Sequence, residues 1–372
     1  MPLKIDSLLG LGMIGCGSFG VFCLNSFTKV KELKIIAVAD VNEKLAKRTA
    51  DKFQCKWYSE TQELINDPEV EMVHIVTPPS THFSLSRYAL QKGKHVLCEK
   101  PLALSLSEAD EILNLAREKR VILPVNLVLR YVPITNIIKE IIRSEILGDP
   151  LRAYFENYAT DSNLDKGHWF WDKKQSGGIF VEHGVHFFDL YDYWFGNGEV
   201  IWAHSATRSN TSQEDRVLCV LKHQNAIISH HYHGFDQPGI LDRQMHRILF
   251  ERGDVVINGW IPESFVINAI MNDKDIFRLK NICKNAKFKV LKEFASNENK
   301  FKCHGKNFTV DQYLQVQYTS NVDKLTLYSN AIADLVIDQI NFTRNQEHKR
   351  VIREENGREA LRMALEASNY VS

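Results

Sequence analysis

The sequence predicts an α/β domain built on a parallel sheet, followed by an α+β domain with a largely antiparallel sheet. Over residues 1–126, short apolar runs alternate with segments of helical spacing, as in strand–helix–strand crossovers. From about residue 151, apolar runs follow one another over short connections, which favours antiparallel pairing. A chain of 372 residues is longer than a domain with one hydrophobic core usually is. We therefore assign residues 1–126 to one domain and 127–372 to the other, whose last helices we allow to pack on the first.

The first apolar run, Leu11-Gly12-Met13-Ile14, leads into Gly15-Cys16-Gly17-Ser18-Phe19-Gly20, and residues 19–30 then have helical spacing. Strand, glycine turn and helix in this order form a dinucleotide-binding fingerprint of the Rossmann type. Gly15 permits the turn, Gly17 lets backbone approach a pyrophosphate, and Gly20 lets the helix pack on the strand. We expect this turn, with Ser18 and Phe19, to bind the cofactor at the helix N-terminus.

A second apolar run, residues 35–39, ends at Asp40. Its distance from Gly20 is typical of the carboxylate that accepts hydrogen bonds from the adenosine ribose hydroxyls. A carboxylate there repels a 2′-phosphate, and the next residues, Val41 and Asn42, carry no positive charge. We therefore expect NAD rather than NADP.

The remaining elements expected in the first domain are a helix over 42–53, a strand over 72–76, a helix over 83–91 capped by Ser80, a strand over 94–98, a helix capped by Ser107 that runs through Arg117, and a strand over 121–125. Ligands on parallel sheets bind beyond the carboxyl ends of the strands. Two such strand-end loops lie here, and we expect their residues to bind the cofactor: Thr77, Pro78, Pro79, His82, Glu99 and Lys100.

In the second domain we expect strands over 152–159, 200–208, 217–222, 226–233, 247–251 and 255–260, and helices over 178–195, 310–342 and 358–370. Residues 262–307 show no clear pattern. Between residues 271 and 310, ten Lys or Arg stand against four Asp or Glu. Such an excess of positive charge could bind a phosphate, a nucleotide-sugar or nucleic acid, but a run of charged residues is more often a solvent-exposed face.

Composition restricts the function classes. The 46 basic and 46 acidic residues balance, which gives no whole-chain reason to expect nucleic acid or an anionic membrane as partner. No apolar run has the length of a membrane span, and no signal-peptide pattern opens the sequence, so we expect a cytoplasmic protein.

Potential metal ligands are also few. The seven cysteines are odd in number and form no CxxC pair, which favours free, mostly buried thiols. His230, His231 and His233 cannot converge on one ion, because neighbours in a strand face opposite sides. We expect no metal site.

Several motifs together resemble the glucose–fructose oxidoreductase / inositol dehydrogenase / MocA (Gfo/Idh/MocA) family of nicotinamide-dependent oxidoreductases. The resemblance covers nearly the whole chain except about 262–307. The matching pieces are Gly15-x-Gly-x-x-Gly20, Asp40, Thr77-Pro78-Pro79-x-x-His82, Glu99-Lys100-Pro101-Leu102, Asn126 with Arg130-Tyr131, Ser176-Gly177-Gly178, the run from Glu182 through His186 to Asp189, and the run from Glu355 to Leu361.

The resemblance implies an active site between the two domains, where a hydroxyl of a sugar, cyclitol or similar polyol is oxidised to a ketone, or the reverse. It implies that Lys100 bonds the reacting oxygen and that His186 is the general acid/base. Glu182 stands where many members carry an aspartate, which is a departure from the pattern. The resemblance also implies pairing of subunits through the second sheet, so we expect a homodimer or homotetramer.

The chemistry of these residue types agrees with those roles. A neutral imidazole can take the hydroxyl proton, and an ammonium group stabilises the developing alkoxide. Glu182 and His186 are four residues apart, so on one helix the carboxylate could orient the imidazole. Each has a structural alternative: Lys100 as an ordinary loop lysine, His186 as a core histidine, and Glu182 as a helix cap or ion-pair partner.

Five further residues are candidates for substrate binding: Asn126, Arg130, Trp169, Trp171 and His183. Tryptophan faces suit sugar rings, although aromatic residues also anchor loops. His183 lies one residue off the shared face of Glu182 and His186, which favours a structural role.

Two other functions remain open for such a chain. A glycosidase that uses NAD transiently would release sugar without net reduction of NAD. A non-catalytic NAD-binding regulator could share the same fold.

Overall fold

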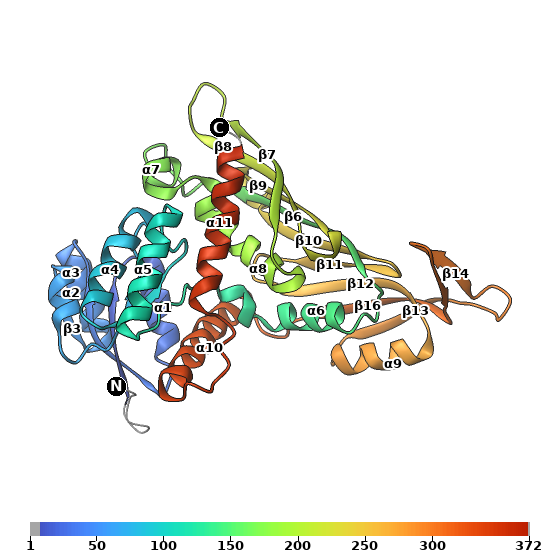
Figure 1. Cartoon of the computed structure of the whole chain (residues 1–372), viewed down its shortest axis with the longest axis horizontal. Helices are drawn as coiled ribbons and strands as arrows, with labels where there is room; N and C mark the ends of the chain where they lie inside the picture. The colour runs from blue at the N-terminus through green and yellow to red at the C-terminus, as the bar shows by residue number, and fades with distance from the viewer. Residues whose placement is uncertain (1–7, 371–372) are drawn as a thin grey trace. The chain divides into compact units, whose positions relative to one another are not determined.

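The computed structural model describes residues 8–370, which form two compact units (Figure 1). The first unit comprises residues 8–131, 166–189 and 328–368, and the second comprises 132–165, 190–327 and 369–370. Both units are discontinuous in sequence, whereas the expected domains 1–126 and 127–372 are continuous, and that boundary stays a prediction. No helix among residues 8–370 combines the length and the apolar character needed to cross a membrane.

A five-stranded parallel sheet with the order β3-β2-β1-β4-β5 forms the first unit's centre, which confirms the predicted α/β domain. Its strands are β1 (Leu9–Ile14), β2 (Leu33–Ala39), β3 (Lys56–Tyr58), β4 (Met72–Ile75) and β5 (His95–Cys98). Helices α1 (Ser18–Phe27), α2 (Glu43–Phe53), α3 (Thr61–Asn66), α4 (His82–Gln91) and α5 (Leu106–Lys119) connect or follow them. Every residue of β1 and β4 is buried, which explains why these strands are almost continuously apolar.

Two predicted helix caps are wrong. A 3-10 turn, Pro79–Thr81, precedes α4, and no side chain caps that helix. The N-cap of helix α5 lies two residues earlier than predicted, because the hydroxyl of Ser105, not Ser107, accepts a hydrogen bond from the Glu108 amide at 3.2 Å. Ser and Thr residues near a helix start are interchangeable by pattern, so only backbone geometry selects the cap.

The strand predicted over 121–125 is absent, although Val125 forms an isolated bridge with Cys98. The Val96 amide donates to the Ile122 carbonyl at 2.9 Å and the Cys98 amide to the Pro124 carbonyl at 3.0 Å. Pro124 has no N–H to return a bond to β5, which interrupts the ladder.

The second unit contains a nine-stranded sheet with the order β13-β16-β12-β11-β10-β6-β9-β8-β7. Its strands are β6 (Pro150–Thr160), β7 (Glu199–Thr207), β8 (Glu214–Lys222), β9 (Ile228–Gln237), β10 (Arg243–Phe250), β11 (Gly253–Asn258), β12 (Ser264–Met271), β13 (Lys287–Glu293) and β16 (Gln312–Thr319). Only β6 and β9 pair in parallel, so the predicted antiparallel character is confirmed.

Helices α6 (Pro133–Arg143) and α9 (Asp273–Ile282) belong to the second unit, and α8 (Val185–Phe195) and α10 (Lys324–Arg344) cross from one unit to the other along the chain. The short helix α7 (Lys173–Ser176) and the final helix α11 (Glu354–Tyr370) lie in the first unit, apart from the last residues of α11. Figure 1 shows α10 and α11 in red near the end of the chain.

The helix predicted over 310–342 is wrong in its first part, since β16 occupies Gln312–Thr319 and α10 begins only at Lys324. In β16 the buried residues Leu314 and Val316 alternate with more exposed ones, which is a strand period. Its partner β12 and the basic strand β13 lie within the segment that showed no pattern, and a two-stranded ribbon, β14 (Lys300–Cys303) with β15 (Lys306–Thr309), completes it.

Alternate residues of the large sheet face a buried core. In β6, Phe155 is buried, whereas Tyr154 and Glu156 on the opposite face are half-buried. His231 is buried and its neighbour His230 is not, which confirms that the two face opposite sides. All seven cysteines are free thiols and five of them are buried, as predicted.

Candidate active site

The glycine turn is shaped for a dinucleotide phosphate. Gly15 has φ +103°, and a Cβ there would lie 2.0 Å from the Val76 carbonyl oxygen, so this position requires glycine. A Cβ at Gly20 would lie 2.1 Å from the Gly15 carbonyl oxygen. Nothing lies within 4 Å of a Cβ built on Gly17, which is the N-cap of α1 and has no side-chain cap. The open space beside Gly17 and the amide groups of the following turn, with Ser18 and Phe19, fit a pyrophosphate.

Asp40 is held at the same turn by two backbone amides. Its Oδ2 accepts from the Cys16 amide and its Oδ1 from the Asn42 amide, both at 2.8 Å. Each carboxylate oxygen keeps a free lone-pair direction, which suits ribose hydroxyl donors. The residues that follow Asp40 in the sequence, Val41 and Asn42, carry no positive charge.

His82 joins the two strand-end loops. Its Nε2 lies 2.8 Å from the Thr77 carbonyl oxygen, and its Nδ1 lies 2.7 Å from the Pro101 carbonyl oxygen. The ring is buried, and burial lowers the pKa of His82, although both carbonyl contacts act in the opposite direction. Thr77 Oγ1 lies 2.7 Å from Thr81 Oγ1. Both ring nitrogens of His82, a residue expected to bind the cofactor, thus contact backbone carbonyl oxygens. Pro78 and Pro79, expected in the same role, follow Thr77 in the loop after β4.

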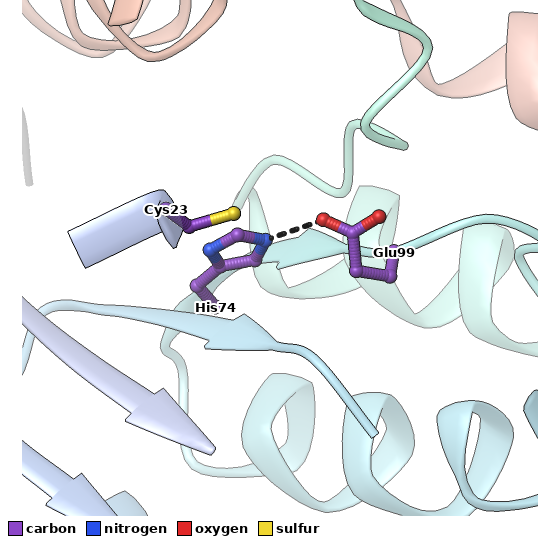
Figure 2. A group of neighbouring side chains, drawn as sticks. All are labelled: Cys23, His74 and Glu99. Atoms are coloured by element: carbon purple, nitrogen blue, oxygen red, sulfur yellow. Dashed lines mark hydrogen bonds and ion pairs between the residues drawn. The ribbon is translucent and has the colours of Figure 1, made fainter. Parts of the chain in front are cut away.

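Glu99 is buried in a small cluster of polar side chains (Figure 2). Its Oε1 accepts from His74 Nε2 at 3.0 Å and from Asn126 Nδ2 at 2.7 Å. The Cys23 thiol from α1 lies beside this pair. The structure therefore brings together Glu99, expected at the cofactor, and Asn126, expected at the substrate, through a direct hydrogen bond. Their predicted ligand contacts stay predictions.

Lys100 and Glu182 form the central ion pair of the site. Lys100 Nζ donates to the Glu182 carbonyl oxygen at 2.7 Å and to the Glu182 carboxylate. The side chains are 17% and 13% exposed, so both remain within reach of a small molecule. Glu182 lies in a π-helical turn, Phe180–Gly184, and α8 follows it. The wider turn changes the helical phase, so the sequence separation of four residues does not by itself align Glu182 with His186.

The two histidines near this pair are neutral at neutral pH. His186 is buried, and burial, followed by the charges of Lys100 and His183, lowers the pKa of His186 well below its usual value. Desolvation and the Lys100 charge lower the pKa of His183 to about 3. Each imidazole therefore has a lone pair that can accept a proton.

Arg130 forms a buried bidentate ion pair with Asp189. Its Nε lies 2.9 Å from Asp189 Oδ2 and its Nη2 lies 2.6 Å from Asp189 Oδ1, and both side chains are almost fully buried. Because Asp189 lies on α8 close to His186, this pair anchors the helix that carries the imidazole. A role of Arg130 in binding substrate stays a prediction.

Trp169 and Trp171 lie on a 3-10 turn, and both are partly exposed. The buried Phe170 between them packs edge-on against Trp171, with ring centroids 4.9 Å apart. Each of the two tryptophans therefore has part of its surface accessible to solvent. Like every site residue described above, they belong to the first unit.

Sequence reasoning did not find His74 and Cys23 as neighbours of Glu99. A signal was present for His74, because a histidine within the apolar run of β4 must find a hydrogen-bond partner once buried. Nothing in the sequence names that partner, since Glu99 is 25 residues away.

Residues 9–127 match a family model described as "Oxidoreductase family, NAD-binding Rossmann fold". Residues 136–256 match one described as "GFO/IDH/MocA C-terminal domain".

Among curated relatives, scyllo-inositol 2-dehydrogenase (NAD(+)) of Bacillus subtilis is 31% identical over 191 residues, which cover 51% of this chain and 53% of that protein. Myo-inositol 2-dehydrogenase of Thermotoga maritima is 30% identical over 189 residues, covering 50% and 54%. Glucose-6-phosphate 3-dehydrogenase of B. subtilis is 28% identical over 215 residues, covering 56% and 61%. The matched region thus spans little more than half the length of these relatives.

Among solved structures, a levoglucosan dehydrogenase in complex with NADH and levoglucosan has a TM-score of 0.78 with 16% identity, and the alignment covers 98% of this chain and 97% of that one. At this identity the likeness shows a shared fold over the full length of both chains.

Proposed function

The chain belongs to the GFO/IDH/MocA oxidoreductase family, and from this premise we propose that it is an NAD-dependent dehydrogenase or reductase. It interconverts a hydroxyl group and a ketone on a sugar, cyclitol or related polyol. The observation that carries this proposal is the Lys100–Glu182 pair, with two neutral histidines beside it and a dinucleotide turn in the same unit. Relatives named for inositols and a sugar phosphate support the substrate class.

The glycine turn and Asp40 would hold the cofactor, since the space beside Gly17 fits a pyrophosphate and the Asp40 carboxylate fits ribose hydroxyls. NAD⁺, when bound, accepts a hydride from the carbinol carbon. The chain's own residues supply placement and charge.

In the oxidation, His186 takes the hydroxyl proton on a ring nitrogen, because its lowered pKa leaves the imidazole neutral. The Lys100 ammonium stabilises the negative charge that develops on the substrate oxygen. Glu182 fixes the direction of the Lys100 side chain by accepting two hydrogen bonds from Lys100 Nζ, one at its carbonyl oxygen and one at its carboxylate. In the reduction, the same groups act in reverse.

The test is a screen of sugars, inositols and their phosphates with NAD and NADP, followed by NADH or NADPH absorbance. We expect reduction of NAD by at least one polyol, and its loss in His186→Ala. Release of free sugar from a glycoside without net NADH would favour the glycosidase instead. Tight NAD binding with neither reaction would favour a regulator.

We further propose a cytoplasmic homodimer or homotetramer. The half-buried face of the large sheet presents Tyr154, Tyr158, Leu218 and Tyr232, with Trp202 42% exposed at the edge strand. The aromatic and aliphatic side chains of this face, which also carries Glu156 and Arg216, favour burial against a second copy. Seven free thiols favour a reducing compartment. Light scattering at micromolar concentration tests the assembly, and a monomer would contradict it.

A further inference from the structure

We propose that His74, Asn126 and His82 are positioning residues that fix Lys100 by holding the residues on either side of it. We call these hydrogen bonds to Glu99 and Pro101, from His74, Asn126 and His82, the clamp. Its catalytic meaning rests on the proposed function, whereas the clamp itself is a property of the folded chain. Lysine reaches its target through a flexible four-carbon stem, so a fixed ammonium needs a fixed backbone.

The residue before Lys100 is held from two elements. Glu99 Oε1 accepts from His74 Nε2, which comes from β4, and from Asn126 Nδ2, which follows the segment beside β5. The Glu99 amide also donates to the Ile75 carbonyl at 3.0 Å. His74, Glu99 and Asn126 are all buried, so none of these hydrogen bonds competes with solvent.

The residue after Lys100 is held from a third element. The Pro101 carbonyl oxygen lies 2.7 Å from Nδ1 of His82, at the start of α4, and the same ring contacts the Thr77 carbonyl. Lys100 is therefore the partly exposed residue between two buried, hydrogen-bonded neighbours. The ammonium group of Lys100 extends from the clamped backbone and donates a hydrogen bond to Glu182.

A metal ion is the competing explanation for the cluster around Glu99. One atom each of Cys23, His74 and Glu99 lie within 4.8 Å of one another, close enough for an ion to bridge them (Figure 2). The observed contacts favour hydrogen bonds instead. A carboxylate only accepts, so His74 Nε2 carries the proton and has no lone pair on the side that faces Glu99, and Glu99 Oε1 already receives a second donor from Asn126. Burial raises the pKa of Cys23 well above its usual value, which keeps the thiol protonated.

The direct test is the acylation rate of Lys100 by acetic anhydride in the apo protein, read by peptide mass spectrometry relative to the exposed Lys34. His74→Val removes one donor to Glu99, and we expect Lys100 labelling to rise about tenfold, the scale of one lost hydrogen bond to a charged group. His74→Gln retains an N–H donor and should return the rate toward that of the wild type. Ile112→Ala, a buried truncation in α5, is the control for general destabilisation and should leave Lys100 labelling unchanged.

If His74→Val does not fold, Asn126→Ala removes the other donor and tests the same clamp. Wild-type labelling of Lys100 in the folded variant overturns the proposal. So does one equivalent of zinc in the purified protein that Cys23→Ala abolishes, because the cluster would then be a metal site.

Kinetics supply a second readout. In His74→Val we expect kcat to fall about tenfold, with partial recovery in His74→Gln and NAD affinity within about threefold of the wild type. A fall in NAD affinity equal to the loss in kcat would overturn the positioning role. A wild type that oxidises no polyol would defeat the proposed function alone, since the labelling needs no substrate.

Discussion

At the scale of single residues, Lys100 and His186 differ in how their charge state is set. Burial and neighbouring positive charge keep His186 neutral, whereas Lys100 is paired with a carboxylate. The two groups thus suit the opposite tasks that we propose for them, proton acceptance by His186 and stabilisation of a negative oxygen by Lys100.

Replacing either group should damage chemistry more than cofactor binding. We expect His186→Ala to lower kcat by about 10²–10⁴-fold, because it removes the general base. Lys100→Ala should also lower kcat strongly, since it removes the charge beside the oxygen. Steady-state kinetics and an NAD titration check this, and near-normal turnover of His186→Ala would contradict it. Because the pKa of His186 is lowered, the acidic limb of the wild-type oxidation profile should lie well below pH 6.5.

Asp40 should set the choice of cofactor. We expect NAD(H) to bind at least about tenfold more tightly than NADP(H), because the fixed carboxylate repels a 2′-phosphate. Asp40→Ser should narrow that ratio, while Asp51→Ser on the exposed side of α2 should not change it. Fluorescence titrations of both nucleotides measure the ratio, and equal wild-type affinities would refute the assignment.

At the scale of elements, the first turn of α5 shows how one local contact decides a boundary. Ser105 and Ser107 are both plausible caps by sequence, but only Ser105 accepts a hydrogen bond from the helix backbone. Its hydroxyl also lies 3.1 Å from that of Ser107.

Substitution of the two serines should therefore have unequal effects. Ser105→Ala should lower the free energy of unfolding by about 1 kcal/mol, the usual worth of an N-cap. Ser107→Ala should change it by less than about 0.5 kcal/mol, as for an exposed surface position. Urea unfolding of both variants makes the comparison, and a larger loss in Ser107→Ala would show that the cap is misassigned.

At the scale of the whole molecule, the large sheet buries several imidazoles in its core. His223 Nε2 lies 2.8 Å from Ser229 Oγ, which lies 3.0 Å from His231 Nε2. Burial lowers the pKa of His223, lowers that of His231 well below its usual value, and lowers that of His246 to about 3. The folded chain therefore holds these rings neutral at pH values where an unfolded chain protonates them.

Stability should consequently fall in mild acid. Below about pH 6.5 the unfolded state binds protons that the folded state excludes, so each such histidine costs up to about 1.4 kcal/mol per pH unit until its folded pKa is reached. Urea unfolding between pH 8 and pH 5 should show this loss. His246→Gln should reduce the slope, and His204→Gln at an exposed position should not. A free energy of unfolding independent of pH in this range would contradict the burial of these rings.

The sequence by itself determined the features that depend on near neighbours in the chain. The glycine turn, Asp40 after β2 and the strand-end loops follow from local spacing and backbone sterics, and each lies where it was expected. The alternation of strand and helix is also as expected, apart from the absent strand over 121–125 and the unpredicted β3 and α3. The six strands predicted from residue 152 to residue 260 are present for the same reason.

Only the tertiary structure decided which distant groups meet. Lys100 binds Glu182 across 82 residues, Arg130 binds Asp189 across 59, and Glu99 meets His74 and Asn126 across 25 and 27. Strand β16 escaped prediction because it pairs with β12 across a long stretch of chain, whereas β12 itself pairs also with the adjacent β11. Local pattern carries no information on such partners, since the packing of whole elements selects them and a π-helical turn can shift the phase of a side chain.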